Sequence, residues 1–471
     1  MEIATETERK YDVPAGFALP SLPGAADPQT FDLDATYFDT DDLRLARHSR
    51  TLRRRSGGSD AGWHLKTPGD GSSRTEHRLP LDGDVVPEEL QTQVRAFVRR
   101  ETLQPVARLR TRRAETPLRD ADGRTLAVIA HDHVRAETGG AQRTWEELEV
   151  ELVDGGPEDL ERIERELLGA GATPAKGPSK LARALGDRLP PSGDAPEINP
   201  VYAYARAQRD AIAAYDPGAR NADPESVHKM RVGTRRLRST LKTFKRSFPE
   251  EAAKQTRSEL RWLAHQLGEV RDGQVLTEKL VGAVEREGPQ FTEVAGQIRD
   301  HLEAKVAHGR EALTDALNGD RYLALLDTID ELVADPDAVE DDPQRRARKV
   351  LRKADRLLDQ ALADGSDAEL HEARKAYKQA RYAVEVFEDA GGKRAKKLIK
   401  ALTNLQDVLG AHQDSVVARE ILEELAGSSS VDSFPYGVLY AHQEEVGRDT
   451  LGDLPVVIQA AGKSKLRAWL D

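Results

Sequence analysis

Charged residues near the start of the chain alternate in a way that could hold a metal ion against a phosphate chain. Glu6, Glu8 and Lys10 are two residues apart, a spacing that puts their side chains on one face of a β-strand. The same spacing relates two further sets, Arg53 with Arg55, and Glu147 with Glu149 and Glu151. Clustered carboxylates suit Mg²⁺ or Mn²⁺, and guanidinium groups bind phosphate oxygens in pairs. A site with both would suit phosphoryl transfer, where positioning and charge neutralisation do most of the work.

A second arginine-rich segment, residues 108–113, is ambiguous. Arg113 lies on one face of a predicted strand, and the opposite face carries Arg108, Arg110 and Arg112. Parity therefore leaves open which of these side chains point into a site, unless a β-bulge intervenes. The nearby His131 and His133 are expected to be surface residues rather than ligands.

The segments that carry these charges predict a β-rich first half. Short alternating runs are separated by Gly, Pro and Asp, as in GGSDAGWHLKTPGDGSS, which is typical of antiparallel strands and hairpins. A closed barrel covered by helices could point both the acidic and the basic sets inward. The alternative is that each set is the solvated outer face of an ordinary half-buried strand.

The second half, from about Val201, has long segments with helical spacing and two basic stripes. Residues at offsets 0, +3, +7 and +10 share one helix face. The first stripe consists of His228, Arg231, Arg235 and Arg238, extended by Lys242. The second consists of His371, Arg374, Lys378 and Arg381. Like charges four residues apart destabilise a helix, which favours an anion-binding site over a solvated face.

The two stripes belong to an internal repeat. The segment LGEVRD ends at Asp272, 44 residues after His228, and LGAHQD ends at Asp414, 43 residues after His371. Such matched spacing predicts a duplicated helical bundle. Asp272 and Asp414 are expected to orient basic side chains or to cap helices. Few aromatic residues accompany the stripes, so we expect a phosphate polymer without bases rather than nucleic acid.

Composition sets the remaining limits. The 471 residues carry 70 basic and 82 acidic side chains, a net charge of -12, which taken alone argues against a polyanion ligand. The chain has no cysteine, which excludes disulfides and thiol catalysis. The sequence has no apolar run of about 18 residues, so we expect no membrane span. The N-terminus has no signal-peptide core, so we expect a cytoplasmic protein. The sequence RLPPSGDAPEINP predicts a linker over 189–198.

The first half resembles the CYTH family, the triphosphate tunnel metalloenzymes. Glu6–Lys10 matches its ExExK signature, and YFDT at 37–40, LRRR at 52–55, HLKTP at 64–68 and SKL at 179–181 follow in the family's order. The resemblance implies an eight-stranded antiparallel tunnel barrel over residues 1–188. Its implied catalytic residues are Glu6, Glu8, Lys10 and Glu149. The implied metal ligands are Glu6, Glu8, Asp132, Glu149 and Glu151. The implied triphosphate contacts are Lys10, Arg53, Arg55, Lys66, Arg110, Arg113 and Lys180.

The second half resembles the CHAD domain, a helical module that binds polyphosphate. HKMRVGTRRLR and HEARKAYKQARYAVE carry this resemblance. It implies a helical domain over 199–471 with two pseudo-repeats, about 201–330 and 340–471, whose stripes line a basic groove or pore.

Together these features predict a metal-dependent triphosphatase that also binds polyphosphate. The expected cofactor is Mg²⁺ or Mn²⁺, and the expected partners are inorganic triphosphate and polyphosphate, with no specific nucleic acid and no membrane. An association with polyphosphate granules is a further expectation. The alternatives are a thiamine triphosphatase, an adenylate cyclase-type enzyme and a non-catalytic polyphosphate-binding scaffold.

Overall fold

The chain folds into two compact units, residues 1–195 and 196–471. The computed structural model describes residues 1–69, 73–189, 199–286, 288, 291–334, 342–428 and 433–470. Most of the predicted linker, residues 190–198, lies outside this part.

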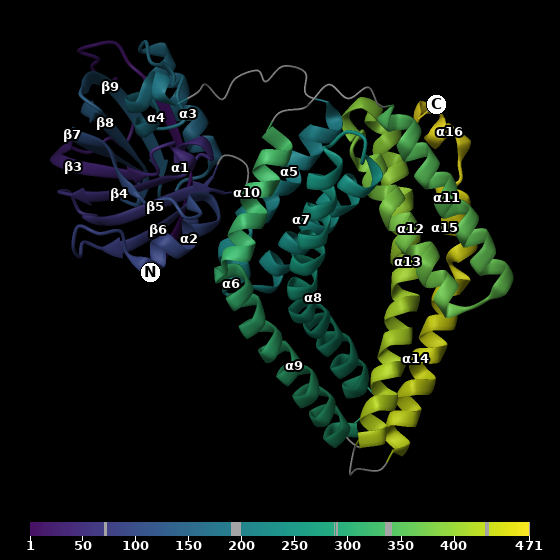
Figure 1. Cartoon of the computed structure of the whole chain (residues 1–471). Helices are drawn as coiled ribbons and strands as arrows, with labels where there is room; N and C mark the ends of the chain where they lie inside the picture. The colour runs from purple at the N-terminus through teal and green to yellow at the C-terminus, as the bar shows by residue number, and fades with distance from the viewer. Residues whose placement is uncertain are drawn as a thin grey trace. The chain divides into compact units, whose positions relative to one another are not determined.

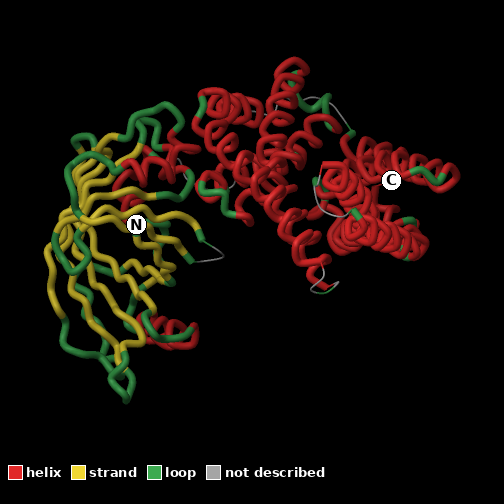
Figure 2. The backbone as a smooth tube through the Cα atoms, turned by 90° about the horizontal axis from the view of Figure 1, so that it is seen from below, coloured by secondary structure: helices red, strands yellow, loops and turns green. Residues whose placement is uncertain are grey.

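The first unit is built on one curved antiparallel sheet (Figures 1 and 2). Its strands are β1 (Glu2–Glu6), β2 (Glu8–Asp12), β3 (Gln29–Asp39), β4 (Thr51–Ser56), β5 (Gly62–Pro68), β6 (Arg74–Pro80), β7 (Gln104–Arg119), β8 (Thr125–Thr138), β9 (Ala141–Leu152) and β10 (Thr173–Pro174). The hydrogen-bonded order is β1-β6-β5-β4-β3-β7-β8-β9-β2-β10. Its helical elements are α1 (Arg44–Arg47), α2 (Glu88–Val98), α3 (Pro157–Gly169), α4 (Lys180–Leu185) and the 3₁₀ turn η1 (Gly186–Arg188).

The prediction of a closed eight-stranded barrel is wrong in two respects. The described sheet has ten strands, and its hydrogen-bonded order ends at β1 and β10 without closing. The N-terminal segment forms two strands because it breaks at Thr7. The first, β1, pairs with β6, and the second, β2, pairs with β9. The two-residue β10 adds the tenth strand beside β2. Thr7 therefore joins β1 and β2 covalently, and no backbone hydrogen bonds close the described sheet between them.

The two faces of the sheet have different coverings. On the outer face, α3 packs Leu160, Ile163 and Leu167 into a buried cluster with strand residues such as Leu148 and Val150. On the inner face, α4 packs Leu181, Ala184 and Leu185 against buried residues of β7 and β8. The inner face is thus apolar where α4 covers it. The rest of that face carries the alternating charges described below.

The second unit is entirely helical in its described part. Its elements are α5 (Pro200–Ala214), α6 (Asp216–Arg220), α7 (Pro224–Thr243), α8 (Glu250–Arg286), α9 (Thr292–Asn318), α10 (Asp320–Ala334), α11 (Pro343–Asp364), α12 (Asp367–Glu385), α13 (Glu388–Ser428), α14 (Phe434–Gly452), α15 (Leu454–Ala461), α16 (Ser464–Arg467) and the 3₁₀ turn η3 (Ala468–Leu470). No described helix is apolar over a stretch long enough to span a bilayer.

Capping residues explain where the two stripe-bearing helices begin. Asp223 accepts a hydrogen bond from the backbone of Ser226 at the start of α7, and Ser366 accepts one from Glu369 at the start of α12. Each helix is followed by a long helical hairpin, α8 with α9 and α13 with α14 (Figure 1). The two hairpins pack together near their turns, where Leu280, Ile298 and Leu422 belong to one buried cluster. At the other end, α7 contacts α12, so the two basic stripes belong to neighbouring helices.

Candidate functional site

The inner face of the sheet encloses a cavity lined by charged side chains. Ten residues predicted from the sequence line it: Glu6, Glu8, Lys10, Arg53, Arg55, Lys66, Arg113, Glu149, Glu151 and Lys180. Strand register explains their convergence, because cross-strand partners face the same side, as do Glu8 with Glu151 and Lys10 with Glu149. The free volume is only about 70 Å³, because the side chains pair across the cavity.

Sequence reasoning missed several lining residues. These are Tyr37, Thr51, Asp60, Arg74, Glu76, Arg78 and Ser179. A signal existed for three of them, since Arg74, Glu76 and Arg78 alternate with the two-residue period of β6. Glu76 is the most central: it is 1% exposed and contacts His64, Lys66 and Arg78. Burial alone would raise its pKa, but His64 and Lys66 hold the pKa of Glu76 well below its usual value.

Asp132 lies behind the cavity lining rather than in it. It is fully buried, and its carboxylate receives two hydrogen bonds from Arg113, at 2.8 and 2.7 Å. Lys180 Nζ lies 2.9 Å from the same carboxylate. In this structure Asp132, which the resemblance assigned to a metal, instead orients two basic side chains.

Glu149 is the meeting point of three cations. Lys10 Nζ and Arg113 Nη2 lie 2.5 and 2.7 Å from its two oxygens, and Lys180 Nζ lies 2.7 Å away. Burial would raise the pKa of Glu149, but Lys10, Lys180 and Arg113 lower it well below the usual value. Glu149 is therefore ionised and fully paired at neutral pH.

The prediction that Arg110 contacts triphosphate is wrong. Its half-exposed side chain lies on the outer face, where it pairs with Glu137 at 3.2 Å and with Asp34 at 3.6 Å. Arg113 is the inward residue of this strand, opposite Asp132 on β8. The pairing of β7 with β8 has no register shift between residues 108 and 113. The alternation of side chains along the strand therefore places Arg110 and Arg113 on opposite faces of the sheet.

One corner of the cavity carries excess negative charge. Partial desolvation and the nearby carboxylates of Glu6, Glu8 and Glu149 raise the pKa of Glu151, although the residue is exposed to solvent. The buried Oε1 atom of Glu8 has only long ion-pair contacts, to Lys10 Nζ at 3.2 Å and to Arg74 Nε at 3.9 Å. A hard divalent cation would neutralise these carboxylates and give that oxygen a closer partner. The residues present therefore fit the metal that the resemblance implies, with Glu6, Glu8 and Glu151 as its candidate ligands.

The opposite corner carries excess positive charge. Burial and the neighbouring Arg53 and Arg113 lower the pKa of Arg55 to about 9, despite its contact with Asp60. A guanidinium group whose pKa falls this far lacks sufficient negative charge nearby. An anion placed among these three arginines would supply that charge.

In the helical unit, the two basic stripes form a second charged cluster. The largest cause that lowers the pKa of Lys378 to about 6 is burial, followed by Arg235, Arg374 and Arg231. Arg235 also has a lowered pKa, through burial and the charges of Arg231 and Arg374. Among the described residues, none of Arg235, Arg374 and Lys378 forms an ion pair. Cations of both pseudo-repeats therefore lie close together without carboxylate partners.

Two glycines lie beside this cluster. Gly268 on α8 lies beside Arg231, and Gly410 on α13 lies beside Arg374. A Cβ atom built on either glycine would stand in ordinary contact, 3.6 or 3.5 Å from a guanidinium nitrogen. The glycines of LGEVRD and LGAHQD thus occupy equivalent places in the two copies.

Other stripe residues differ between the two copies. Asp272 pairs with Arg231 through two contacts of 2.6 and 2.8 Å, as expected of an orienting residue. Asp414 instead pairs with Lys279 on α8. His371 contacts Gln413 at 2.6 Å, whereas burial and Arg271 lower the pKa of His228.

The far ends of the stripes differ as well. Arg381 is neutralised by Glu385 on its own helix. Burial and the nearby Arg261 lower the pKa of Arg238, and Lys242 is exposed. In the described part of these helices, only the α12 end of the stripes is therefore neutralised by a carboxylate on its own helix.

Comparisons with known proteins agree with both halves. The CYTH domain family matches residues 4–184 and the CHAD domain family matches residues 203–423. MT2285, an uncharacterized protein of Mycobacterium tuberculosis (strain CDC 1551), is 36% identical over 508 aligned positions, which cover 98% of this chain and 97% of that protein.

Two solved structures are also similar. PptA from Streptomyces chartreusis is 20% identical with a TM-score of 0.47, matched over 55% of this chain and 98% of its own. The CHAD domain of the plant Ricinus communis is 27% identical with a TM-score of 0.41, matched over 56% of this chain and 88% of its own.

Both domain matches fall in the predicted order, and the mycobacterial relative spans nearly the whole chain. The chain therefore belongs to the family of proteins in which a CYTH domain precedes a CHAD domain.

Proposed function

We propose that the CYTH domain hydrolyses inorganic triphosphate with a divalent cation, Mg²⁺ or Mn²⁺. The observation that carries the proposal is that one enclosed cavity has an acidic corner and a basic corner. A phosphate chain bridged by a cation would neutralise both corners at once. Proteins with CYTH domains typically act on triphosphate compounds, which favours three phosphates as the ligand.

The lining of the cavity favours an inorganic substrate. All of its described lining residues are charged or carry a hydroxyl group, and Tyr37 is the one aromatic residue among them. The Tyr37 hydroxyl accepts a hydrogen bond from Arg53 at 3.4 Å. Thiamine triphosphate and ATP carry organic rings that would need apolar surface. The lining therefore supports inorganic triphosphate over these two alternatives.

The site residues then divide the work. Glu6, Glu8 and Glu151 would hold the cation, which when bound polarises the phosphate chain. Arg53, Arg55 and Arg113 would hold the outer phosphate oxygens and neutralise the charge that develops on the leaving phosphate. Lys66 contacts Glu6 and would turn to a phosphate oxygen once the carboxylate has another partner.

Glu149 would orient the attacking water, and one of its carboxylate oxygens must first be released from its present contacts. Its two oxygens are occupied by Lys10, Lys180 and Arg113. Phosphate oxygens would draw these cations toward the substrate, which frees a carboxylate oxygen to accept a hydrogen bond from water. Substrate binding would thus allow Glu149 to position the attacking water.

Phosphate release tests this proposal. We expect release from inorganic triphosphate with Mg²⁺ or Mn²⁺, faster than from thiamine triphosphate or ATP, and none without a metal. The variant E6Q/E8Q should lose at least about a hundredfold in rate. The control E137Q changes a glutamate on the outer face and should retain full activity. A fully active E6Q/E8Q would contradict the proposal, and inactivity on all substrates would favour a non-catalytic scaffold.

We also propose that the CHAD domain binds inorganic polyphosphate at the stripe cluster, and that this binding localises the protein to polyphosphate granules. The support is the group of cations that lack carboxylate partners, Arg235, Arg374 and Lys378, next to Arg231. Few aromatic side chains accompany them, which disfavours nucleic acid. A net charge of -12 makes long-range attraction weak, so local geometry must provide the affinity.

A polyphosphate titration checks this second proposal. We expect the variant R231A/R235A/R374A/K378A to lose most of its affinity, and the affinity of the wild type to fall steeply with salt. A matched control removes four exposed lysines outside the cluster, Lys229, Lys254, Lys305 and Lys375. Equal losses in both variants would show a general charge effect and contradict a specific site. A single-stranded oligonucleotide should compete poorly.

A further inference from the structure

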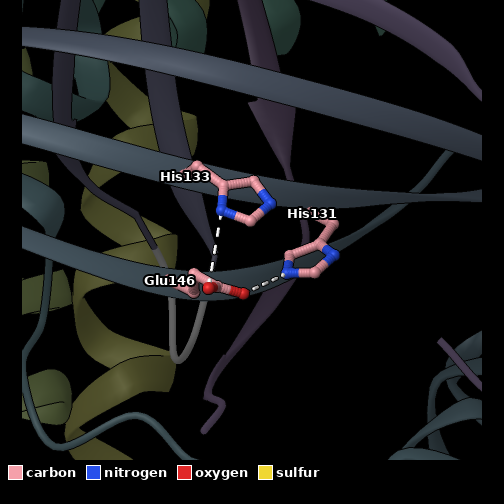
Figure 3. A group of neighbouring side chains, drawn as sticks. All are labelled: His131, His133 and Glu146. Atoms are coloured by element: carbon pink, nitrogen blue, oxygen red, sulfur yellow. Dashed lines mark hydrogen bonds and ion pairs between the residues drawn. The ribbon is translucent and has the colours of Figure 1, made fainter. Parts of the chain in front are cut away.

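A group of three metal-binding side chains lies outside the cavity. His131 and His133 are on β8 and Glu146 is on β9, where it is the cross-strand partner of His133. Asp132 lies between the two histidines and points inward, so strand alternation places both imidazoles on the outer face. Figure 3 shows both rings beside the one carboxylate.

The donor atoms are close enough to one another for small side-chain rotations to bring them onto one zinc ion. The Nε2 atom of His131 is 3.2 Å from one Glu146 oxygen, and the Nδ1 atom of His133 is 3.5 Å from the other. With metal–ligand bonds of about 2.0–2.1 Å, two tetrahedral ligands stand roughly 3.3 Å apart. All three donor atoms lie within 4.8 Å of one another. Two imidazoles and a carboxylate leave the fourth position open to water.

Neighbouring groups hold these ligands in place. The backbone N–H of Gly16 donates to the Oε1 atom of Glu146 at 3.1 Å, the oxygen nearer to His133, and so restrains the carboxylate. The ring of Phe17 stands edge-on to His131, and the two imidazoles stack with centroids 4.9 Å apart. Such outer contacts orient ligands and reduce the entropy lost when a metal binds.

We propose that His131, His133 and Glu146 form a site for Zn²⁺ or a similar first-row transition ion, separate from the metal site of the cavity. Imidazole donors select such ions over Mg²⁺, which prefers oxygen ligands. The ion would join β8 to β9, the strands that carry Asp132 and Glu149 on their inner face. The inference does not rest on the proposed triphosphatase activity. Without a metal, the same three residues are a surface cluster of ion pairs, and the sequence alone favoured that interpretation.

A calorimetric titration of the full chain with Zn²⁺ at pH 7.5 distinguishes a metal site from a surface cluster of ion pairs. With excess Mg²⁺ present to occupy the cavity site, we expect one Zn²⁺ to bind the wild type, and Co²⁺ in its place to show the visible absorption of a tetrahedral site. The variant H131A/H133A should lower the affinity by about a hundredfold or more. E146Q keeps the size of the side chain and should also weaken binding. Excess Mg²⁺ should not compete.

Two controls make the result specific. The variant H265A/H308A removes two exposed histidines elsewhere and should bind Zn²⁺ as the wild type does. E6Q/E8Q changes the cavity and should also retain this site, so failure of the triphosphatase proposal would leave it intact. Zn²⁺ should raise the melting temperature of the wild type but not of H131A/H133A, whose folding circular dichroism would verify. Unchanged stoichiometry and affinity in folded H131A/H133A would overturn the proposal.

Discussion

Arg113 and Asp132 form a bidentate ion pair across β7 and β8, with nitrogen–oxygen distances of 2.8 and 2.7 Å. The carboxylate is fully buried, and the guanidinium reaches the cavity from it to contact Glu149. The pair thus links the framework of the sheet to the lining of the site. The position of Arg113 therefore depends on a fully buried residue behind the cavity lining.

Replacing Asp132 with asparagine should therefore affect stability and activity together. Removing one partner of a buried pair costs up to about 3–5 kcal/mol, and here Glu149 still compensates part of the charge of Arg113 and Lys180. We expect this loss in urea denaturation, with unfolding of residues 1–195 followed by hydrogen exchange in β7 and β8. Phosphate release should also fall. The control D34N breaks the exposed pair with Arg108 and should cost less than about 1 kcal/mol; a similar cost for D132N would contradict this role.

Replacing Glu151 with glutamine should have opposite effects on stability and function. Its pKa is raised in the folded protein, so the folded state prefers the neutral form and loses stability as pH rises through the titration. The variant E151Q removes that penalty, so the metal-free protein should unfold at a higher urea concentration. Metal affinity and phosphate release should both decrease. A destabilised E151Q, or one with normal metal affinity, would show that Glu151 does not belong to an acidic corner.

Polyphosphate affinity should depend on pH through Lys378. Its pKa of about 6 means that it is charged below pH 6 and neutral above, when no anion is bound. Above pH 6 binding must therefore take up a proton, and affinity should fall with rising pH by at most about tenfold per unit. Titrations between pH 5.5 and 8 should show this slope in the wild type and a flatter one in K378R, which stays charged.

The stripes also carry His228 and His371, so these residues need their own control. H228Q/H371Q retains Lys378 and should therefore keep the slope that Lys378 produces above pH 7. Calorimetry in buffers of different ionisation enthalpy would count the protons taken up. An identical slope in K378R and the wild type would exclude Lys378 as its source.

The space beside Gly410 should set how large a residue that position accepts. Alanine would place a Cβ atom in ordinary contact with Arg374, 3.5 Å away, and would favour the helix by up to about 1 kcal/mol. G410A should thus bind polyphosphate normally and be equally or more stable. G410L should displace the guanidinium and weaken binding without unfolding α13. Equal binding by both variants would mean that Arg374 does not contribute.

Much of the molecule was predictable because strand and helix periods are local. The two-residue period placed Glu6, Glu8 and Lys10 on one face, and all three line the cavity. The helical period grouped Arg231 with Arg235 and Arg374 with Lys378, and each pair lies in the cluster. The family followed from short motifs in order, and the domain matches confirmed it.

Other features were decided only by contacts between distant segments. Parity separated Arg110 from Arg113, but the pairing of β7 with β8 determined which of them faces the cavity. The break at Thr7 divided the N-terminal segment into β1 and β2, and together with β10 it gave ten strands in an unclosed sheet instead of the predicted eight-stranded barrel. The packing of α7 against α12 lowered the pKa of Lys378, and the pairing of β8 with β9 brought Glu146 to two histidines. The sequence by itself determined which side chains share an element's face; tertiary structure decided which faces meet, because those contacts join residues far apart in the chain.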